Sequence, residues 1–341
     1  MGTGGSAGVG MSGKVVKTDG DFRDPEIERR IFARAGVELV ELHQPTIEEL
    51  VEHARDADGL MVLAHPVAGP LLDELPRLKV VARYGVGVDN VDVGTATSLG
   101  VAVTYVPDYC IDEVSSHAVA LMLAVWRKLV PLSRVAPGGT FPAMEAVRPV
   151  RRLAGSRVGL VGFGALGQAV ARKLGGFDVE IVAADPQVPD HVFASHGVAR
   201  VELAELLETS DTVSIHTSLN PATFHLIGAD EISRMKPGAV VVNTARGAVV
   251  DQAQLVRALR DGHLGGAGLD VLEKEPPDPD DELLHLPNVI VTPHVGAYSE
   301  EAIAMLQERA ASAVVDVLSG VRPPHLADPA VWERRRGVTA S

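Results

Sequence analysis

The chain has 341 residues, of which 46% are apolar and 22% are charged, and this size and composition suit about two ordinary globular domains. The formal net charge of -14 disfavours nucleic-acid binding, because an acidic protein repels phosphate backbones. The single cysteine, Cys110, excludes an internal disulfide framework and a cysteine-rich zinc site, and no apolar run approaches the roughly 18 residues that a membrane-spanning helix needs. We therefore expect a cytoplasmic protein that binds neither membranes nor nucleic acids.

The N-terminal part of the chain has the pattern of an α/β unit. Residues 1–13 are rich in Gly and Ser, which predicts a loose leader. After them, short β-branched runs alternate with helix-like stretches, and the predicted strands cover residues 37–42, 59–63, 80–83 and 101–104. Such alternation predicts parallel strands joined by crossover helices.

The middle of the chain begins with a long apolar segment and then returns to strand–helix alternation. Residues 111–129 are predicted to form a connecting helix with Asp112 as its N-cap and Pro131 as its end, and residues 137–149 have the turn composition of a loop. The next predicted strands cover residues 157–161, 180–184, 212–216, 239–244, 266–269 and 289–292. This run matches a complete dinucleotide-binding domain. Residues 299–318 are predicted to be a final helix, and the residues after 323 a tail.

A glycine-rich turn joins the strand at 157–161 to the helix that follows it. In this turn Gly162 permits the tight bend, Gly164 lets the backbone approach a pyrophosphate, and Gly167 allows the helix to pack closely. The next strand ends at Asp185, whose carboxylate can accept hydrogen bonds from the ribose hydroxyls of an adenosine and would repel the extra phosphate of NADP. A glycine-rich turn alone is weak evidence, but turn, helix, strand and acid together predict NAD as the cofactor.

Three charged residues, Arg246, Glu275 and His294, follow predicted strands of this second unit, where ligands bind in open α/β sheets. Reduction of a ketone needs a proton donor, and histidine is the side chain that titrates closest to neutral pH. A carboxylate such as Glu275 would orient the imidazole, and Arg246 offers a planar fork for a substrate carboxylate. Taken singly, each residue has an ordinary explanation as a solvated or structural side chain, but together their roles are complementary.

Ordered motifs along the chain are similar to those of a known enzyme family. They are ARYGVGVDNVDV (82–93), GFGALG (162–167), HTSLNPATFHLIG (216–228), VVVNTARGAVVD (240–251), GLDVLEKEPP (268–277) and TPHVGAYSEEA (292–302). From about residue 37 to residue 318 the chain resembles the D-isomer-specific 2-hydroxyacid dehydrogenases. The resemblance implies an NAD-dependent enzyme that moves a hydride between nicotinamide and C2 of a small 2-hydroxy or 2-keto acid such as glyoxylate, hydroxypyruvate or a pyruvate-like acid.

The resemblance also assigns site residues. It implies that Arg246, Glu275 and His294 are the catalytic residues, and that the backbone of Val86 and Gly87 binds the substrate carboxylate together with Arg246. Beyond the glycine turn, the implied cofactor contacts are Ala165, Leu166, Asp185, Thr217, Ser218, Thr223, Thr244, Ala245 and Asp270. No constellation of histidines and acids has the spacing of a metal site.

The implied fold class is α/β, with two Rossmann-like domains built on parallel, doubly wound sheets. A flavodoxin-like substrate domain comprises residues 14–107 and 299–323, the NAD-binding domain comprises residues 108–298, and residues 1–13 and 324–341 are expected to be flexible tails. Family members are commonly homodimers through the helix that corresponds to residues 111–129.

Some motifs point to a different class of protein. VPDYC (106–110) and YSEEA (298–302) resemble the corepressor branch of the family, so an NADH-responsive binding protein is the alternative to an enzyme. Ala297 stands where that branch usually has an aromatic residue, and Ser116 replaces an acid that is common in the family. The loop at residues 63–66 has no arginine to meet a substrate phosphate, which makes 3-phosphoglycerate a poor candidate.

Overall fold

The computed structural model describes residues 13–20, 22–139 and 144–337, and its backbone contacts divide the chain into two compact units. Unit 1 combines Met1–Tyr109 with Ser299–Ser341, and unit 2 is Cys110–Tyr298. Unit 2 is therefore an insertion in the sequence of unit 1. The division falls two residues after the first predicted boundary and coincides with the second.

Unit 1 is built on a five-stranded parallel sheet in the order β2-β1-β3-β4-β5. Its strands are β1 (Gly13–Lys17), β2 (Val37–Glu41), β3 (Gly59–Val62), β4 (Val80–Arg83) and β5 (Ala102–Thr104). The order is that of flavodoxin-like sheets, as predicted. Of the predicted leader, residues 1–12 lie outside the described residues, whereas Gly13 begins β1.

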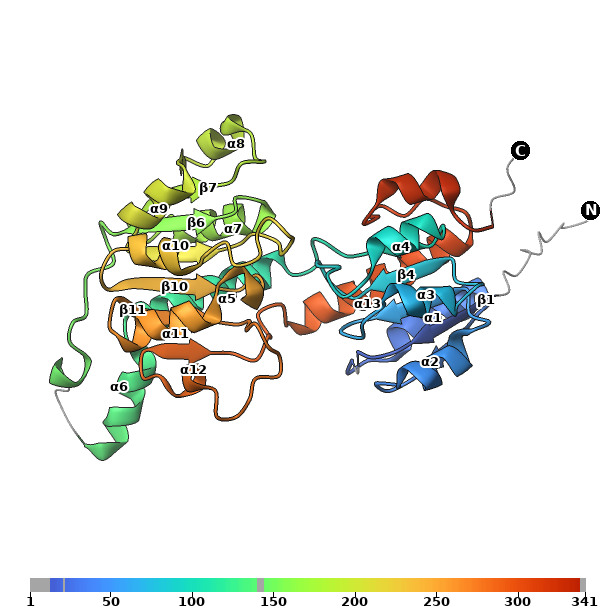
Figure 1. The fold of residues 1–341 in the computed structure, drawn as a ribbon, viewed down its shortest axis with the longest axis horizontal. Coiled ribbons are helices and arrows are strands. Elements are labelled where there is room, and N and C mark those ends of the chain that lie inside the picture. Colours follow the sequence, from blue (N-terminus) through green and yellow to red (C-terminus); the bar gives the residue numbers. More distant parts are fainter. Residues whose placement is uncertain (1–12, 21, 140–143, 338–341) are drawn as a thin grey trace, which may run out of the picture. The chain divides into compact units, whose positions relative to one another are not determined.

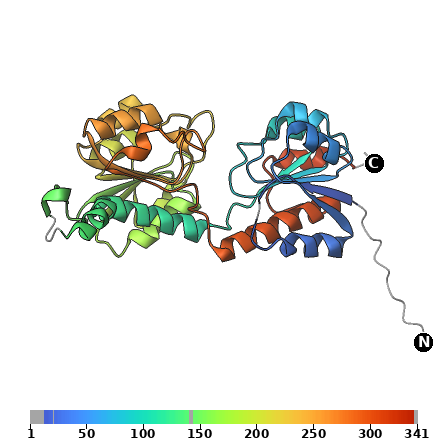
Figure 2. The ribbon, with the colours of Figure 1, turned by 90° about the horizontal axis from the view of Figure 1, so that it is seen from below.

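Helices cover both faces of the sheet of unit 1, as Figure 2 shows from below. They are α1 (Glu26–Ala35), α2 (Ile47–Ala54), α3 (Gly69–Asp73), α4 (Val93–Ser98), α13 (Glu300–Leu318) and the 3-10 helix η4 (Pro329–Arg334). On one face Phe32 of α1 and Val314 of α13 share a buried core with Val80 of the sheet. On the other face Leu50 of α2 and Leu72 of α3 pack in a second core. Segments from both ends of the chain thus complete one domain.

Unit 2 is built on a seven-stranded parallel sheet in the order β12-β11-β10-β9-β6-β7-β8. Its strands are β6 (Arg157–Val161), β7 (Glu180–Ala184), β8 (Ala199–Arg200), β9 (Thr212–Ile215), β10 (Ala239–Asn243), β11 (Leu264–Leu269) and β12 (Val289–Val291). The strand order reverses direction between β6 and β9, and ligands of doubly wound sheets bind at this reversal, outside the carboxyl ends of the strands. The predicted fold class, α/β with two parallel-sheet domains, is confirmed.

Figure 2 shows helices on both faces of the sheet of unit 2, and Figure 1 labels most of them. They are α5 (Ile111–Trp126), α6 (Leu129–Val135), α7 (Ala165–Leu174), α8 (Asp190–Ser195), α9 (Leu203–Thr209), α10 (Ala229–Arg234), α11 (Gln252–Arg260), α12 (Glu282–His285) and the 3-10 helices η1 (Ala136–Gly138), η2 (Met144–Val147) and η3 (Gly247–Val249). On one face Met122 of α5 and Val170 of α7 pack in a core with Leu160 of β6. On the other face Leu206 of α9 and Leu255 of α11 pack in a separate core.

The prediction of one helix over residues 111–129 is wrong in its details. Helix α5 ends at Trp126, Lys128 adopts a left-handed conformation with φ 51°, and α6 then begins at Leu129. Pro131 does not end a helix but lies in the first turn of α6, where the missing N–H of proline costs no hydrogen bond. The N-cap of α5 is Cys110 rather than Asp112, whose carboxylate pairs with Lys173 at 2.5 Å instead.

The prediction of a flexible tail from residue 324 is wrong as far as residue 337. Val331 and Trp332 are buried in the core of unit 1, and Leu326 forms an antiparallel bridge with Thr104 of β5. Burial of these apolar side chains holds the segment in place, since it removes their surface from water. Residues 338–341 lie outside the described residues.

Candidate active site

The glycine turn after β6 has a distinct local reason for each of its glycines. Gly162 has φ +93°, and a Cβ there would lie 2.8 Å from the backbone carbonyl carbon of His216. A Cβ at Gly167 would lie 2.4 Å from the carbonyl oxygen of Gly162, so helix α7 packs directly on the turn. A Cβ at Gly164 meets no atom within 4 Å. The backbone of Gly164 is therefore open to the approach of a ligand.

The first turn of α7 and Asp185 flank this opening. Ala165 and Leu166 begin α7, and the first amides of a helix have no partner within it and favour an anion. Asp185 directly follows β7, and its carboxylate accepts hydrogen bonds from the N–H of Phe163 and of Gln187, both at 2.9 Å. A carboxylate has about four acceptor positions, so Asp185 keeps capacity for ribose hydroxyls.

The loop after β9 contains three of the predicted cofactor contacts. Thr217 and Ser218 lie just beyond the carboxyl end of β9. The hydroxyl of Thr223 lies 2.7 Å from the carbonyl oxygen of Ser218 and accepts the N–H of Asn220 at 2.8 Å. Thr223 therefore shapes its own loop, in addition to any contact with a ligand.

Buried polar atoms without partners gather at the ends of β9 and β10. The Thr244 hydroxyl oxygen and both ring nitrogens of His216 are buried and make no hydrogen bond within the protein. The N–H of Ala245, next to Thr244, donates to the side chain of Asn243 at 3.0 Å. Because buried polar groups normally find partners, these atoms favour a polar ligand at this edge of the sheet. Together with the cradle at Gly164, they fit a dinucleotide.

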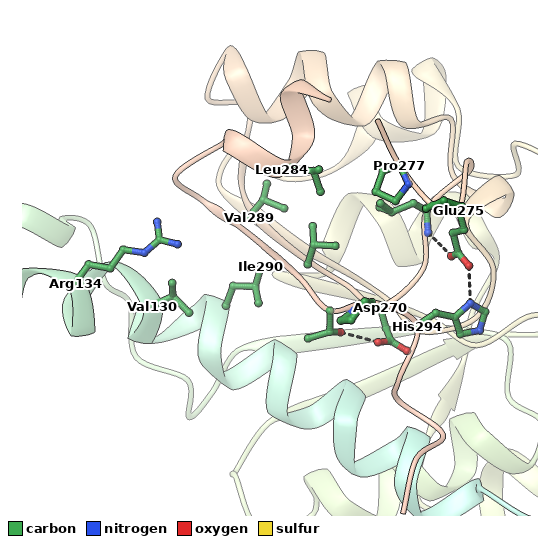
Figure 3. Close-up of a pocket in the computed structure, with 14 residues that line it drawn as sticks. Val130, Arg134, Asp270, Glu275, Pro277, Leu284, Val289, Ile290 and His294 are labelled. Atoms are coloured by element: carbon green, nitrogen blue, oxygen red, sulfur yellow. Dashed lines mark hydrogen bonds and ion pairs between the residues drawn. The ribbon is translucent and has the colours of Figure 1, made fainter. Parts of the chain in front are cut away.

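His294 and Glu275 form a hydrogen-bonded pair in unit 2 (Figure 3). The imidazole Nδ1 lies 2.6 Å from Glu275 Oε2, and the other carboxylate oxygen accepts the N–H of Leu272 at 2.8 Å. Burial acts to raise the pKa of Glu275, but the hydrogen bonds from His294 and Leu272 and the charge of Arg246 outweigh it, so the pKa lies below its usual value. Glu275 is therefore ionised at neutral pH and orients the ring of His294.

Arg246 belongs to the same part of unit 2. It follows β10, and its backbone carbonyl accepts a hydrogen bond from the side chain of Asn243 at 2.9 Å. Its guanidinium donates to the carbonyl of Ala245 at 2.8 Å, and its charge is among the causes that lower the pKa of Glu275. The structure thus brings Arg246 near the pair of Glu275 and His294.

Asp270, predicted as a cofactor contact, is the centre of a cluster that the sequence did not reveal. Its buried carboxylate accepts hydrogen bonds from the hydroxyl of Thr292 at 2.6 Å and from the N–H groups of Val295 and Gly296 at 3.0 and 2.8 Å. His117 of α5 lies beside this cluster, with its Nε2 2.8 Å from the hydroxyl oxygen of Thr292. The sequence carries only a slight signal for this cluster, which is the position of Thr292 two residues before His294.

The predicted substrate contacts Val86 and Gly87 lie in unit 1, in the segment between β4 and α4. The side chain of Val86 is exposed. The loop at residues 63–66 belongs to the same unit, and the carboxylate of Asp19 accepts hydrogen bonds from the N–H groups of Leu63, Ala64 and His65 at 2.6, 2.6 and 2.9 Å. Sequence reasoning missed Asp19.

A pocket of about 590 Å³ opens next to the pair of His294 and Glu275 (Figure 3). Val130 and Arg134 of α6 line one side, and the residues of β12 line another. Most of its other lining side chains are aliphatic or proline. This apolar hollow lies at the edge of the sheet, because β12 is the last strand.

The described residues contain neither a candidate metal site nor a candidate membrane span. In this part of the chain no three His, Cys, Asp or Glu side chains are grouped so that they could hold a metal ion. None of its helices is long and apolar enough to cross a bilayer.

Comparisons with known proteins agree with this geometry. Residues 119–296 match the family model for the NAD-binding domain of D-isomer-specific 2-hydroxyacid dehydrogenases. A glyoxylate reductase of Korarchaeum cryptofilum is 38% identical over 296 residues, which are 85% of this chain and 89% of that protein. A glycerate dehydrogenase of Methylorubrum extorquens is 34% identical, over 91% of this chain and 98% of that protein. Among solved structures, a glyoxylate reductase from Paecilomyes thermophila superposes with a TM-score of 0.84 at 27% identity, over 93% of this chain and 98% of that chain.

Proposed function

The chain belongs to the D-isomer-specific 2-hydroxyacid dehydrogenase family, and on this premise we propose that its substrates are glyoxylate and hydroxypyruvate. It is an NAD-dependent oxidoreductase that acts on small 2-keto acids and the corresponding D-2-hydroxy acids. Relatives named glyoxylate reductase and glycerate dehydrogenase support these two substrates, because hydroxypyruvate is the keto acid of glycerate. They do not favour the alternative of a corepressor-type binding protein.

The observation that carries the proposal is the hydrogen bond of 2.6 Å between His294 and Glu275, with Arg246 nearby. Bound NADH supplies a hydride to C2 of the keto acid. His294 donates the proton that turns the carbonyl oxygen into a hydroxyl, and because Nδ1 faces Glu275, this proton comes from Nε2. Glu275 keeps the ring oriented through the hydrogen bond to Nδ1. Arg246 grips the substrate carboxylate with its planar fork and polarises the adjacent carbonyl.

The remaining site residues have supporting roles in the proposal. The glycine turn and the first residues of α7 hold the pyrophosphate, and Asp185 accepts the ribose hydroxyls and disfavours NADP. The roles of Thr217, Ser218, Thr223, Thr244, Ala245 and Asp270 at the cofactor, and of Val86 and Gly87 at the substrate carboxylate, stay predictions.

The hydrogen bonds of the loop at residues 63–66 favour the proposal that the substrate carries no phosphate group. Three consecutive backbone N–H groups could bind a phosphate, but in this loop they already donate to the carboxylate of Asp19. The anionic Asp19 and the absence of an arginine from the loop sequence LAHP make phosphorylated acids unfavourable. We therefore expect little turnover of the keto acid derived from 3-phosphoglycerate.

The test is NADH oxidation with a panel of 2-keto acids, measured for the wild type and three variants. His294→Ala should lower kcat by about 100- to 10,000-fold while the Kd for NADH stays nearly constant, because proton donation by a positioned group contributes on this order. Glu275→Gln should also lower kcat. His191→Ala, at an exposed position of α8, is the matched control and should behave as the wild type.

Several outcomes would contradict the proposal. Unchanged turnover in His294→Ala would remove His294 from the mechanism. A lack of NADH oxidation with every acid of the panel would reject the proposed substrates. Comparable kcat/KM values with NADH and NADPH would reject the role of Asp185.

We also propose a homodimer, in which a second copy covers the edge of unit 2. Helix α6 buries none of its described side chains, Leu129 is 53% exposed, and the neighbouring strand β12 is only partly buried. Light scattering should give twice the mass of one chain, and Val130→Asp should shift the mass toward the monomer.

A cytoplasmic location stays a prediction from the single cysteine.

A further inference from the structure

The segment that presents His294 has a backbone conformation that needs support. His294 has φ 54°, a left-handed conformation that is unfavourable for a residue with a side chain. Its N–H donates to the carbonyl oxygens of Asp270 and Thr292, both at 2.9 Å. The position of the imidazole therefore depends on how firmly residues 292–296 are held.

The Asp270 carboxylate anchors residues 292–296 by accepting hydrogen bonds from them. Oδ1 accepts the Thr292 hydroxyl at 2.6 Å and the Val295 N–H at 3.0 Å, while Oδ2 accepts the Gly296 N–H at 2.8 Å. A Cβ at Gly296 would lie 2.7 Å from Oδ2, so only glycine permits this approach. Asp270 thus fixes the chain on both sides of His294.

His117 extends the support to helix α5. Its Nε2 lies 2.8 Å from the Thr292 hydroxyl oxygen and 3.4 Å from Asp270 Oδ1. A hydroxyl has one proton, and Thr292 donates it to Asp270, so its oxygen must accept the second hydrogen bond from His117. Nε2 of His117 is therefore protonated, and the hydrogen bonds run from His117 through Thr292 to Asp270.

Helix α5 is a rigid base for this contact. Its buried residues Ala118 and Met122 pack in the same core as Leu160 of β6, and Val119 and Val125 are also buried there. The ring of His117 therefore has little freedom to follow a displaced Thr292. The network connects a buried face of α5 to the segment that bears His294.

We propose that His117 and Thr292 are positioning residues for His294. They do not touch the reacting atoms, but they hold the turn at residues 292–296 in the conformation in which the His294 imidazole meets both Glu275 and the substrate. The inference rests on the proposed function, since it assigns to these residues a part in proton donation. A misplacement of about 1 Å can cost about 100-fold in rate, so a modest loosening should be measurable.

The first test uses the shape of threonine. Thr292→Val keeps the volume of the side chain but lacks the hydroxyl, and it should lower kcat per folded molecule by about 10- to 100-fold, a larger change than in the Kd for NADH. The buried Asp270 loses one hydrogen bond in this variant, so Tm should fall as well. Thr292→Ser restores the hydroxyl and should return kcat to within about threefold of the wild type. A structural role alone would lower Tm in Thr292→Val but would leave kcat per folded molecule as in the wild type.

The second test uses His117. His117→Leu should lower kcat to a similar extent as Thr292→Val, and the double variant should lose no more than the larger of the two single losses, because both act through one network. His117→Gln retains a donor and should be impaired less than His117→Leu. If Thr292→Val does not fold, the comparison of these two His117 variants decides the proposal.

The outcomes separate this inference from the proposed function. If His294→Ala abolishes turnover whereas Thr292→Val and His117→Leu keep the wild-type kcat, the positioning role is refuted and the proposed function stands. An equal loss of kcat in Thr292→Ser and Thr292→Val also refutes it, since the hydroxyl would then be irrelevant. If His294→Ala retains turnover, proton donation by His294 is refuted and the positioning role with it, whereas only a lack of turnover by the wild type would reject the proposed function.

Discussion

At the scale of single residues, His216 at the end of β9 is a buried side chain that destabilises the ligand-free protein. Its ring nitrogens are buried without hydrogen-bond partners, and burial lowers its pKa from 6.5 to about 4. The ring is therefore neutral at pH 7 in the folded state. Because the pKa of His216 differs between the folded and the unfolded chain, the free energy of unfolding depends on pH.

We predict that His216 weakens the fold as the pH falls from about 6.5 towards 4. Between these pH values His216 is protonated in the unfolded chain but neutral in the folded chain, which favours the unfolded chain. The free energy of unfolding is therefore full above pH 6.5 and falls as the pH approaches 4. The loss amounts to about 3 kcal/mol in the free energy of unfolding. His216→Gln does not titrate and should lose less stability over this range, whereas the exposed His191→Gln should follow the wild type.

The measurement is urea unfolding at pH 7 and pH 4.5, followed by tryptophan fluorescence. The chain has two tryptophans, Trp126 in unit 2 and Trp332 in unit 1, so a Trp332→Phe background reports unit 2 alone. Parallel losses of stability in His216→Gln and its parent would disprove the prediction.

At the scale of elements, two glycines of the turn between β6 and α7 have different roles: Gly167 is needed for packing and Gly164 leaves space for a ligand. The space around Gly164 is open, while a Cβ at Gly167 collides with the backbone of Gly162. Backbone cannot move aside as a flexible side chain can, so a Cβ at Gly167 should disturb the fold and a Cβ at Gly164 should not.

We predict that alanine at these two glycines has different effects. Gly167→Ala should destabilise unit 2 by about 1–3 kcal/mol and weaken NADH binding, because the turn must open to admit the methyl group. Gly164→Ala should leave Tm unchanged but raise the Kd for NADH, because its methyl group occupies the proposed pyrophosphate site. Gly176→Ala meets no atom within 4 Å and is the control. Equal Kd values for Gly164→Ala and the wild type would contradict the proposed cofactor site.

Elements with a strong apolar pattern were predictable, and those set by single backbone conformations were not. The bounds of β4, β6 and β7 follow from their β-branched runs, whereas β8 has only two residues and no pattern. The break between α5 and α6 depends on the left-handed Lys128, which its sequence does not signal. Similarly, strand ends predict that Glu275 and His294 are neighbours, but the contact of His117 with Thr292 joins residues 175 positions apart and depends on tertiary packing.

At the scale of the whole molecule, the last described residues complete unit 1. The segment that includes Leu326 runs beside β5, which is the edge strand of the sheet, and the Ala327 N–H donates to the carbonyl of Val103 at 2.8 Å. The guanidinium of Arg336 donates to the carbonyl oxygens of Leu99, Leu75 and Leu78. The segment therefore covers an edge that would otherwise expose unpaired backbone groups.

We predict that removal of residues 324–341 destabilises unit 1 and leaves unit 2 intact. Loss of the buried Trp332 alone should cost about 3–5 kcal/mol, and Val331 and the contacts of Arg336 are lost with it. Removal of residues 338–341 deletes none of these contacts and is the matched control. Hydrogen exchange should accelerate in peptides that cover β5, while Trp126 fluorescence should report unchanged unfolding of unit 2. If β5 kept its protection in the shortened chain, the segment would be dispensable, and its burial would contribute nothing to the stability of unit 1.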